Sequence, residues 1–462
     1  MKLLAIVCVS IGLSLALIDR DAENKSSFDP NNYENNDVLR RDVAVIGGGA
    51  TGTYGVIKLK DAGKSVVLVE KAAILGGHED TYFDPVTGIS VDYGVQAYLN
   101  ISVVRDFFAR FDIPIIDYLF EGGTTVYADF KTGEVLLGFT QGFNFSLYAA
   151  QLDKYPDLAW SWTLPSPVPE DLLIPFRDFV IKYSLQSVAY SVYAFCAGVS
   201  NVLDQLTVNI FKWFDKAYLV GIAGGNVATA RRDNGELFRK ALVELGHNAL
   251  VSSTVIAAQR PANGKVKLVV NTPTGTKLII ASQILITIPP LLKNMDPFDL
   301  NSHEYDLFSK WSYSAYYTTL INNTGFPNGY SYINAGANTL YHIPNLPAVY
   351  SINPTRIDGL FYGWYGSATE LTQSEVQSDI TAVVGRLTNN TQAHPGFPAF
   401  SSHTPCKLVV DADAIANGFY KELYALQGKR NTWYTGAALL SHNSAGLWNF
   451  TQALLPSIVA AV

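Results

Sequence analysis

The chain has 462 residues, of which 48% are hydrophobic and 16% are charged. This composition excludes a disordered protein, and the length allows two or three globular units with sizeable cores. The formal net charge is −7, from 33 basic against 40 acidic residues without a basic cluster, which excludes nucleic acid as an expected partner.

The first sixteen residues have the pattern of a secretory signal peptide. Lys2 precedes an apolar run that is short for a membrane span, and Ser14 and Ala16 are small residues of the kind that signal peptidase accepts. We predict a signal peptide over 1–16, cleavage after Ala16 and a secreted protein, with an uncleaved anchor as the alternative. No later stretch is long and apolar enough to span a bilayer, and 17–40 is a polar lead-in.

Six Asn-X-Ser/Thr acceptors agree with export, at Asn24, Asn100, Asn144, Asn322, Asn389 and Asn449. We expect Asn449 to be unmodified, because it falls in a segment predicted to be a buried helix. Removal of the leader leaves Cys196 and Cys406. Cys196 lies in an apolar run and is expected to be a buried thiol, while a disulfide between the two stays open.

Residues 42–70 predict a strand, a turn, a helix and a second strand. Gly47 permits the tight turn, Gly49 lets the backbone approach a pyrophosphate, and Gly52 lets the helix pack on the sheet. The helix beginning near Ala50 directs free N–H groups at the phosphate. Glu70, which ends the second strand, can bind an adenosine ribose diol and disfavours a 2′-phosphate. The segment therefore predicts FAD or NAD binding.

A glycine doublet, Gly76-Gly77, then precedes His78, and a short strand ends at Asp92. This order resembles the flavin amine oxidase superfamily, whose members carry an acid, a spacer, Gly-Gly-Arg and a strand leading to Asp-x-Gly beside the flavin. In this chain His78 stands in the arginine position. The resemblance implies FAD as cofactor, with Gly76, Gly77 and His78 among its binding residues.

Pattern changes along the chain predict two interleaved domains. A helical, aromatic-rich stretch with several prolines follows Phe139, and strand-like alternation fills much of 312–367. The predicted fold class is α/β, a Rossmann-like FAD-binding domain of the amine-oxidase type with an interleaved α+β substrate domain. The predicted ranges are 41–130, 230–295 and 405–462 for the FAD-binding domain, and 131–229 and 296–404 for the substrate domain.

The resemblance extends to later segments. Val255 matches a family valine whose backbone meets the adenine, and Gly436 matches a glycine on the phosphate side. Gly446, Leu447 and Trp448 match the start of a helix whose N–H groups point at flavin O2. Leu447 stands where amine-oxidising members often carry an aromatic residue of the substrate cage.

A lysine that holds water near flavin N5 is common in the superfamily after a strand ending in Pro-Pro, and Lys293 lies close to that place. The alternative is a solvated surface lysine. His78 raises a further pair of alternatives: a covalent bond to the flavin 8α-methyl, or a hydrogen bond to phosphate or to Glu79. The seven histidines are scattered in the sequence, and no metal-binding or hydrolase motif occurs, so we expect no metal.

Within the superfamily, the Gly-Gly-His form and the ending NTWYTGAALLSHNSAGLWNFTQALLP look most like the fungal β-cyclopiazonate dehydrogenase family. That resemblance implies oxidation of a small secondary-metabolite or amine-like substrate, with O2 as acceptor. Two alternatives stay open: a redox-neutral isomerase of polyunsaturated fatty acids, and a binding protein that keeps FAD as a structural part. The sequence does not indicate the oligomeric state.

Overall fold

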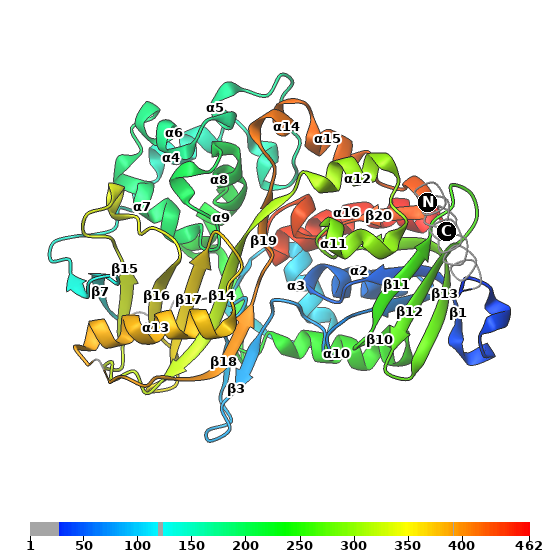
Figure 1. The fold of residues 1–462 in the computed structure, drawn as a ribbon, viewed down its shortest axis with the longest axis horizontal. Helices are drawn as coiled ribbons and strands as arrows, with labels where there is room; N and C mark the ends of the chain where they lie inside the picture. Colours follow the sequence, from blue (N-terminus) through cyan, green and yellow to red (C-terminus); the bar gives the residue numbers. More distant parts are fainter. Residues whose placement is uncertain (1–26, 119–122, 391) are drawn as a thin grey trace, which may run out of the picture.

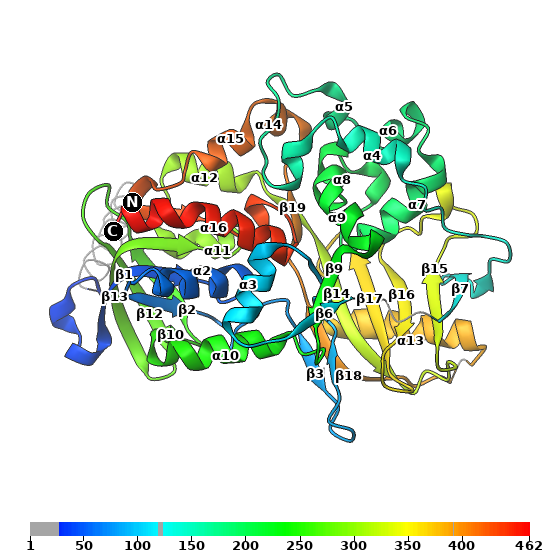
Figure 2. The ribbon, with the colours of Figure 1, turned by 180° about the vertical axis from the view of Figure 1, so that it is seen from behind.

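The computed structural model describes residues 27–118, 123–390 and 392–462. The predicted signal peptide and Asn24 lie outside these ranges. The described residues form two bodies, each built on one large sheet, and the chain passes between them several times (Figures 1 and 2). Within these ranges no helix is long and apolar enough to cross a membrane.

The first body is a Rossmann-like sheet with helices on both faces. Its described strands run in the order β10-β2-β1-β13-β12-β11, with β20 paired to β13. Neighbours from β10 to β13, and β20, are parallel, whereas β12 and β11 are antiparallel additions. The strands are β1 (Val38–Ile46), β2 (Val66–Val69), β10 (Ala249–Leu250), β11 (Thr254–Gln259), β12 (Val266–Thr272), β13 (Gly275–Ile286) and β20 (Thr432–Tyr434).

Alternation along β1 divides the core of this body into two layers. Val43 and Val45 pack with one layer of helices, and Ala44 and Ile46 with the opposite layer. Because helices cover both faces of the sheet, the buried parts of these strands have continuous apolar sequences. The first layer consists of α2 (Ala50–Asp61), α3 (Ser102–Arg110), α10 (Gly235–Leu245) and α16 (Ser444–Ala460), and the second includes α11 (Leu292–Met295), α12 (Ser302–Ser309), α14 (Ala412–Ala416) and α15 (Phe419–Tyr424).

The second body has a sheet whose described strands run in the order β18-β14-β17-β16-β15-β7-β8, with β19 paired to β14. Helix α13 (Gln373–Thr388) covers one face through an apolar stripe that includes Val376 and Ile380. A helical layer lies against the other face (Figure 1). The strands are β7 (Thr124–Asp129), β8 (Glu134–Val135), β14 (Ser312–Asn322), β15 (Tyr330–Asn334), β16 (Ala348–Pro354), β17 (Phe361–Ser367), β18 (Gly396–Ser402) and β19 (Cys406–Val409).

Short elements complete the two bodies. The hairpin of β3 (Thr81–Phe83) and β4 (Ser90–Asp92) packs through Val91 against Leu320 and Leu360 of the second body. A small sheet has the order β5-β9-β6. Its strands are β5 (Tyr98–Leu99), β6 (Ile115–Asp117) and β9 (Asn226–Thr229), and the helical layer is α4 (Ser146–Leu152), α5 (Glu170–Leu173), α6 (Phe176–Lys182), α7 (Gln186–Phe195), α8 (Thr207–Trp213) and α9 (Lys216–Val220).

Several boundaries differ from the sequence prediction. The predicted boundary at residue 130 falls inside the β7–β8 hairpin, and β7 pairs with β15, so this hairpin belongs to the second sheet. β19 also pairs with the second sheet, although it lies within 405–462. Strand β13 continues through the polar residue Gln283, which is buried and forms hydrogen bonds with Trp433 and Ala461. Strand pairing depends on distant partners, which a local pattern does not contain.

The structure shows the state of the two cysteines and the exposure of one glycosylation acceptor. Cys196 and Cys406 are both buried and free, and burial raises the pKa of their thiols to about 12 and about 11. The structure therefore contains two unreactive thiols instead of a disulfide. Asn449 lies in α16 as predicted, but its side chain is exposed, so the expectation of a buried acceptor was wrong.

Candidate functional site

The carboxyl ends of β1, β13 and β20 meet at one edge of the first sheet. Gly47 follows β1 with φ +100°, a conformation that favours glycine. The Thr287 hydroxyl after β13 is 2.9 Å from the Ile46 carbonyl and 3.1 Å from that of Gly47. Gly436 follows β20, and a Cβ there would lie 2.7 Å from the Thr287 carbonyl oxygen. Ligands of open α/β sheets bind at such an edge.

Two glycine-rich turns form an open cradle beside this edge. Gly49 and Gly76 are joined by a parallel bridge, and Gly76 has φ +125°. A Cβ added to Gly49 would meet only the Gly77 Cα, at 3.8 Å, so protein atoms leave space there. A Cβ on Gly52 would lie 1.8 Å from the Gly47 carbonyl oxygen, which confirms that Gly52 permits close packing of the helix.

Helix α2 begins at Ala50 with Gly49 as its N-cap, and no side chain of the described residues caps it. The N–H groups of its first turn therefore remain available to an anion such as a pyrophosphate. The Glu70 carboxylate accepts the backbone N–H groups of Gly48 at 2.6 Å and Ala72 at 2.7 Å. Glu70 thus braces the turn and retains lone pairs for a ribose diol. Val255 lies in β11, just beyond Ser253, whose N–H donates to the Glu70 carbonyl.

The loop after the glycine doublet is tied to the start of α16. The buried Glu79 carboxylate accepts hydrogen bonds from the Ser444 and Tyr98 hydroxyls, each at 2.7 Å. Ser444 is the first residue of α16, so two segments that are 365 positions apart in the sequence meet here. Burial, aided by the charges of Asp92 and Asp80, raises the pKa of Glu79 to about 8 despite these hydrogen bonds.

The raised pKa of Glu79 predicts a pH-dependent stability difference from Glu79→Gln. A carboxyl whose pKa rises from 4.5 unfolded to about 8 folded loses stability as the pH rises through this window. At about 1.4 kcal/mol per pKa unit the loss is on the order of 4 kcal/mol. Urea unfolding of both proteins should give similar stabilities at pH 5 and a less stable wild type at pH 9. A constant difference across this range would contradict the assignment.

Three histidine rings stack where the two bodies meet. The His78 ring lies parallel to that of His403, with ring centroids 4.1 Å apart, and to that of His442 at 6.1 Å. His403 Nε2 is 3.0 Å from Asp80 Oδ2, and His442 Nε2 accepts the backbone N–H of Lys407 at 3.1 Å. Burial and the neighbouring imidazoles lower the pKa of His78 well below its usual range, and burial lowers that of His442 to about 3. Both rings are therefore neutral at pH 7.

These contacts correct two readings of the histidines. The histidines are not all scattered, because three of the seven stack in this histidine cluster. His78 does not bond to Glu79, whose carboxylate is engaged by Tyr98 and Ser444, and the His78 ring makes no hydrogen bond to any described residue. The described residues contain no group of three or more metal-ligating side chains suited to a metal ion. Local sequence does not predict the stacking, because His403 follows β18 and belongs to the second body.

The start of α16 also differs from the prediction. The helix begins at Ser444, and Asn443 caps it by accepting the N–H groups of Ala445 and Gly446. The Leu447 N–H donates to the Asn443 carbonyl, so these amides already have partners within the helix end. The predicted set of N–H groups directed at a flavin oxygen is therefore absent from this described segment.

Trp448 has a different role from the predicted one. Its side chain is completely buried among aromatic rings of α2 and α3, including Tyr54 and Phe107. Its indole N–H donates to the carbonyl of Ala50 at 3.0 Å. Trp448 therefore connects α16 to the first turn of α2 and so helps to position the start of α2.

The predicted catalytic lysine does not lie in a buried site. The Lys293 side chain is 55% exposed, with its ammonium 3.2 Å from the Tyr313 hydroxyl and 3.9 Å from Glu370. Lys293 belongs to the short helix α11, which turns it to the surface. The catalytic assignment was wrong, and the alternative of a solvated surface lysine is the one that the structure supports.

The remaining residues fit an FAD dinucleotide. The open space beside Gly49, the uncapped start of α2 and the carboxylate of Glu70 lie together at one sheet edge. These are the features that a pyrophosphate and an adenosine ribose require. The histidine cluster and Gly436 extend this edge toward the second body.

Comparisons with known proteins agree with this site. A family model for NAD(P)-binding Rossmann-like domains matches residues 45–111. The FAD-dependent oxidoreductase dbaF of Emericella nidulans is 44% identical, covering 100% of this chain and 99% of the relative. The FAD-dependent oxidoreductase pigF of Monascus ruber is 41% identical over the full length of both. Beta-cyclopiazonate dehydrogenase of Aspergillus oryzae is 31% identical, covering 93% of this chain and 96% of the relative.

Solved structures share the fold at low sequence identity. A CLA-producing fatty acid isomerase from P. acnes has a TM-score of 0.72 at 17% identity, covering 90% of this chain and 98% of the other. Cyclohexylamine oxidase from Brevibacterium oxydans has a TM-score of 0.64 at 16% identity, covering 91% and 98%. Given its full-length relatives, the chain belongs to the family of FAD-dependent oxidoreductases that includes beta-cyclopiazonate dehydrogenase, and FAD is its cofactor.

Proposed function

We propose that this enzyme is secreted and removes a hydride from a carbon next to nitrogen, or from another activated carbon, of a secondary metabolite, with O2 as the final acceptor. The observation that carries the proposal is the junction of the glycine cradle with the start of α16 through Glu79 and Ser444, beside the second sheet. FAD supplies the electron sink for this chemistry when bound. The relatives are FAD-dependent oxidoreductases and a dehydrogenase.

The residues of the chain bind and orient the cofactor and keep positive charge away from the junction of the two bodies. The cradle and the start of α2 hold the phosphates, and Glu70 holds the ribose. The neutral rings of His78 and His442 place no positive charge at the junction at pH 7. The surface position of Lys293 leaves no role for it in proton transfer.

An isomerase is a second candidate, favoured by two observations. Leu447, which is buried and aliphatic, stands where an aromatic cage residue would favour amines. The fatty acid isomerase from P. acnes shares the fold. A binding protein that keeps FAD without turnover is the third candidate.

One assay separates these candidates. The purified holoprotein is incubated with amines, indole alkaloids and polyunsaturated fatty acids, and peroxide release and substrate conversion are measured together. We expect conversion with equivalent peroxide. Conversion of a fatty acid without peroxide would instead establish the isomerase, and no conversion of any compound would leave the binding protein.

We predict that FAD is held without a covalent bond to His78. The His78 ring packs against the rings of His403 and His442, and of the two alternatives we expect the hydrogen bond to phosphate. Acid precipitation should therefore give a colourless pellet and free FAD in the supernatant. A yellow wild-type pellet that becomes colourless in His78→Ala would show the covalent bond instead.

Export is tested on the mature protein from its native host. We expect a chain that begins near Leu17 and that loses mass on treatment with a glycosidase. Asn100, Asn144 and Asn389 are exposed and accessible to modification. A chain that begins at Met1 and keeps its mass would contradict secretion.

A further inference from the structure

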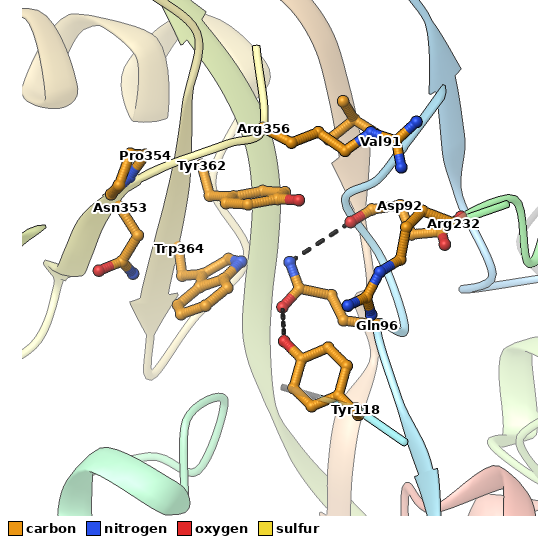
Figure 3. A pocket seen from close by; sticks show the side chains of 10 residues that line it. All are labelled: Val91, Asp92, Gln96, Tyr118, Arg232, Asn353, Pro354, Arg356, Tyr362 and Trp364. Carbon is orange, nitrogen blue, oxygen red and sulfur yellow. Dashed lines mark hydrogen bonds between the residues drawn. The ribbon is translucent and has the colours of Figure 1, made fainter. Parts of the chain in front are cut away.

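A cleft outside the glycine cradle lies between the two bodies (Figure 3). The volume of this cleft is about 40 Å³. One wall comes from β4 and from the segments after β4, β6 and β9, and the other comes from β16, the segment after it and β17. The residues that decide its chemistry are Asp92, Arg232, Asn353, Arg356, Tyr362 and Trp364.

Two buried oxygen atoms in this cleft have no hydrogen-bond partner among the described residues. Asp92 is 4% exposed, and its Oδ1 accepts the Thr81 hydroxyl and the Asn234 N–H, whereas Oδ2 has no partner among the described residues. Asn353 is 3% exposed, and its Nδ2 donates to Ser351 Oγ, whereas its Oδ1 has no partner among them. Leaving such buried atoms unpaired is unfavourable. A hydroxyl group of a ligand would donate a hydrogen bond to one of them.

Two guanidinium groups give the cleft a positive charge. The Arg232 guanidinium lies 4.9 Å from the Tyr118 ring centroid, and neither Arg232 nor Arg356 forms an ion pair with any described residue. Burial raises the pKa of Asp92 to about 7, so its charge only partly offsets the two arginines at neutral pH. The cleft therefore favours an anion and disfavours a protonated amine.

Aromatic side chains form the wall opposite β4. Tyr362 and Trp364 are two positions apart on β17, so both project from the same face of the sheet. Their rings are stacked, with centroids 6.0 Å apart and an interplanar angle of 24° (Figure 3). A flat conjugated ring fits this wall and the narrow enclosed space better than a bulky aliphatic group.

We propose that the cleft binds the substrate, and that this substrate carries a flat aromatic ring with a carboxylate and a hydroxyl group in addition to the activated carbon that gives up the hydride. Its carboxylate pairs with Arg232 and Arg356, its ring lies against Trp364, and its hydroxyl donates to Asn353 or Asp92. This proposal rests on the proposed function, because it names the substrate class of that enzyme. It differs from an amine substrate in the sign of the charge that the protein recognises.

Three matched probes test the sign of this charge on the holoprotein. They are para-hydroxybenzoate, its neutral amide and para-hydroxybenzylamine, which share one ring and one hydroxyl. Isothermal titration calorimetry measures binding without requiring turnover. We expect the carboxylate to bind about tenfold more tightly than the amide, as for one charge-assisted contact, and the amine to bind most weakly.

Variants locate the binding in the cleft. Arg356→Gln and Arg232→Gln should each reduce carboxylate affinity about tenfold and leave amide affinity nearly unchanged. Arg40→Gln, which removes an exposed arginine from β1, is the matched control and should bind like the wild type. Unchanged flavin absorbance in all three verifies that they are folded.

The outcomes are separate from those for the proposed function. Loss of the carboxylate preference in both cleft variants but not in the control supports the proposal, even if no compound of the turnover panel is converted. Equal or tighter binding of the amine, or a carboxylate preference that both cleft variants retain, overturns it. If either of these results overturns the proposal, peroxide release with amines would still support the proposed function.

Discussion

Gly49→Val is expected to give a folded protein that has lost its flavin. The nearest atom to a Cβ at this position is the Gly77 Cα at 3.8 Å, so the protein alone accommodates the start of a side chain. The larger group would project into the space beside the start of α2, where a pyrophosphate must approach the backbone. Absorbance of the purified variant should show no oxidised flavin, with or without added FAD.

Ala72→Val is the matched control for this change. Ala72 is exposed and lies two positions after Glu70, so the added methyl groups stay outside the cradle. The control should retain full flavin content, and circular dichroism should show the same secondary structure in both variants. A yellow Gly49→Val protein would contradict the placement of the phosphates.

Arg260→Met is expected to cause the largest loss of stability. Arg260 is completely buried, and its NH1 and NH2 groups each lie 2.8 Å from an oxygen of Glu304, which is itself buried. Its Nε donates to the Phe298 carbonyl at 2.6 Å, and NH1 also reaches the Tyr434 hydroxyl. Removing Arg260 leaves the buried Glu304 carboxylate with Arg430 as its remaining cationic partner, and loss of one partner from such a buried pair costs about 3–5 kcal/mol. Urea unfolding should show this loss in the free energy of unfolding.

Two further variants show whether the loss of stability comes from the Glu304 charge that has lost Arg260. The double variant Arg260→Met with Glu304→Leu removes both charges and should be more stable than the single variant. Lys310→Met removes an exposed ion pair with Asp306 and should change stability little. If Arg260→Met unfolds at the same urea concentration as the wild type, the pair does not stabilise the junction of β11, α12 and β20.

The sequence predicted those parts of the fold whose causes are local. The glycine spacing after β1 correctly predicted the turn, helix α2 and the role of Gly52. These glycines are required by steric contacts with residues close to them in the sequence. Gly436 was predicted beside the cofactor, and it lies directly after β20 at the same sheet edge as Gly47.

The parts that were missed depend on contacts between distant segments. The histidine cluster joins residues 78, 403 and 442, and no single segment shows that their rings stack. Trp448 reads as part of a cofactor helix, but packing of α16 on α2 and α3 turns its side chain into the core. Lys293 follows the expected strand closely in sequence, yet α11 directs it to the surface. Side-chain direction is set by such packing.

Anaerobic mixing of the holoprotein with a compound that it converts tests the central claim most directly. We predict that the flavin loses its oxidised absorbance when the substrate is in excess, and that air restores the absorbance with release of one peroxide for each product molecule. This result would show that the site formed by the two ends of the chain accepts the hydride. Conversion of the substrate while the flavin absorbance stays that of the oxidised form would contradict the account.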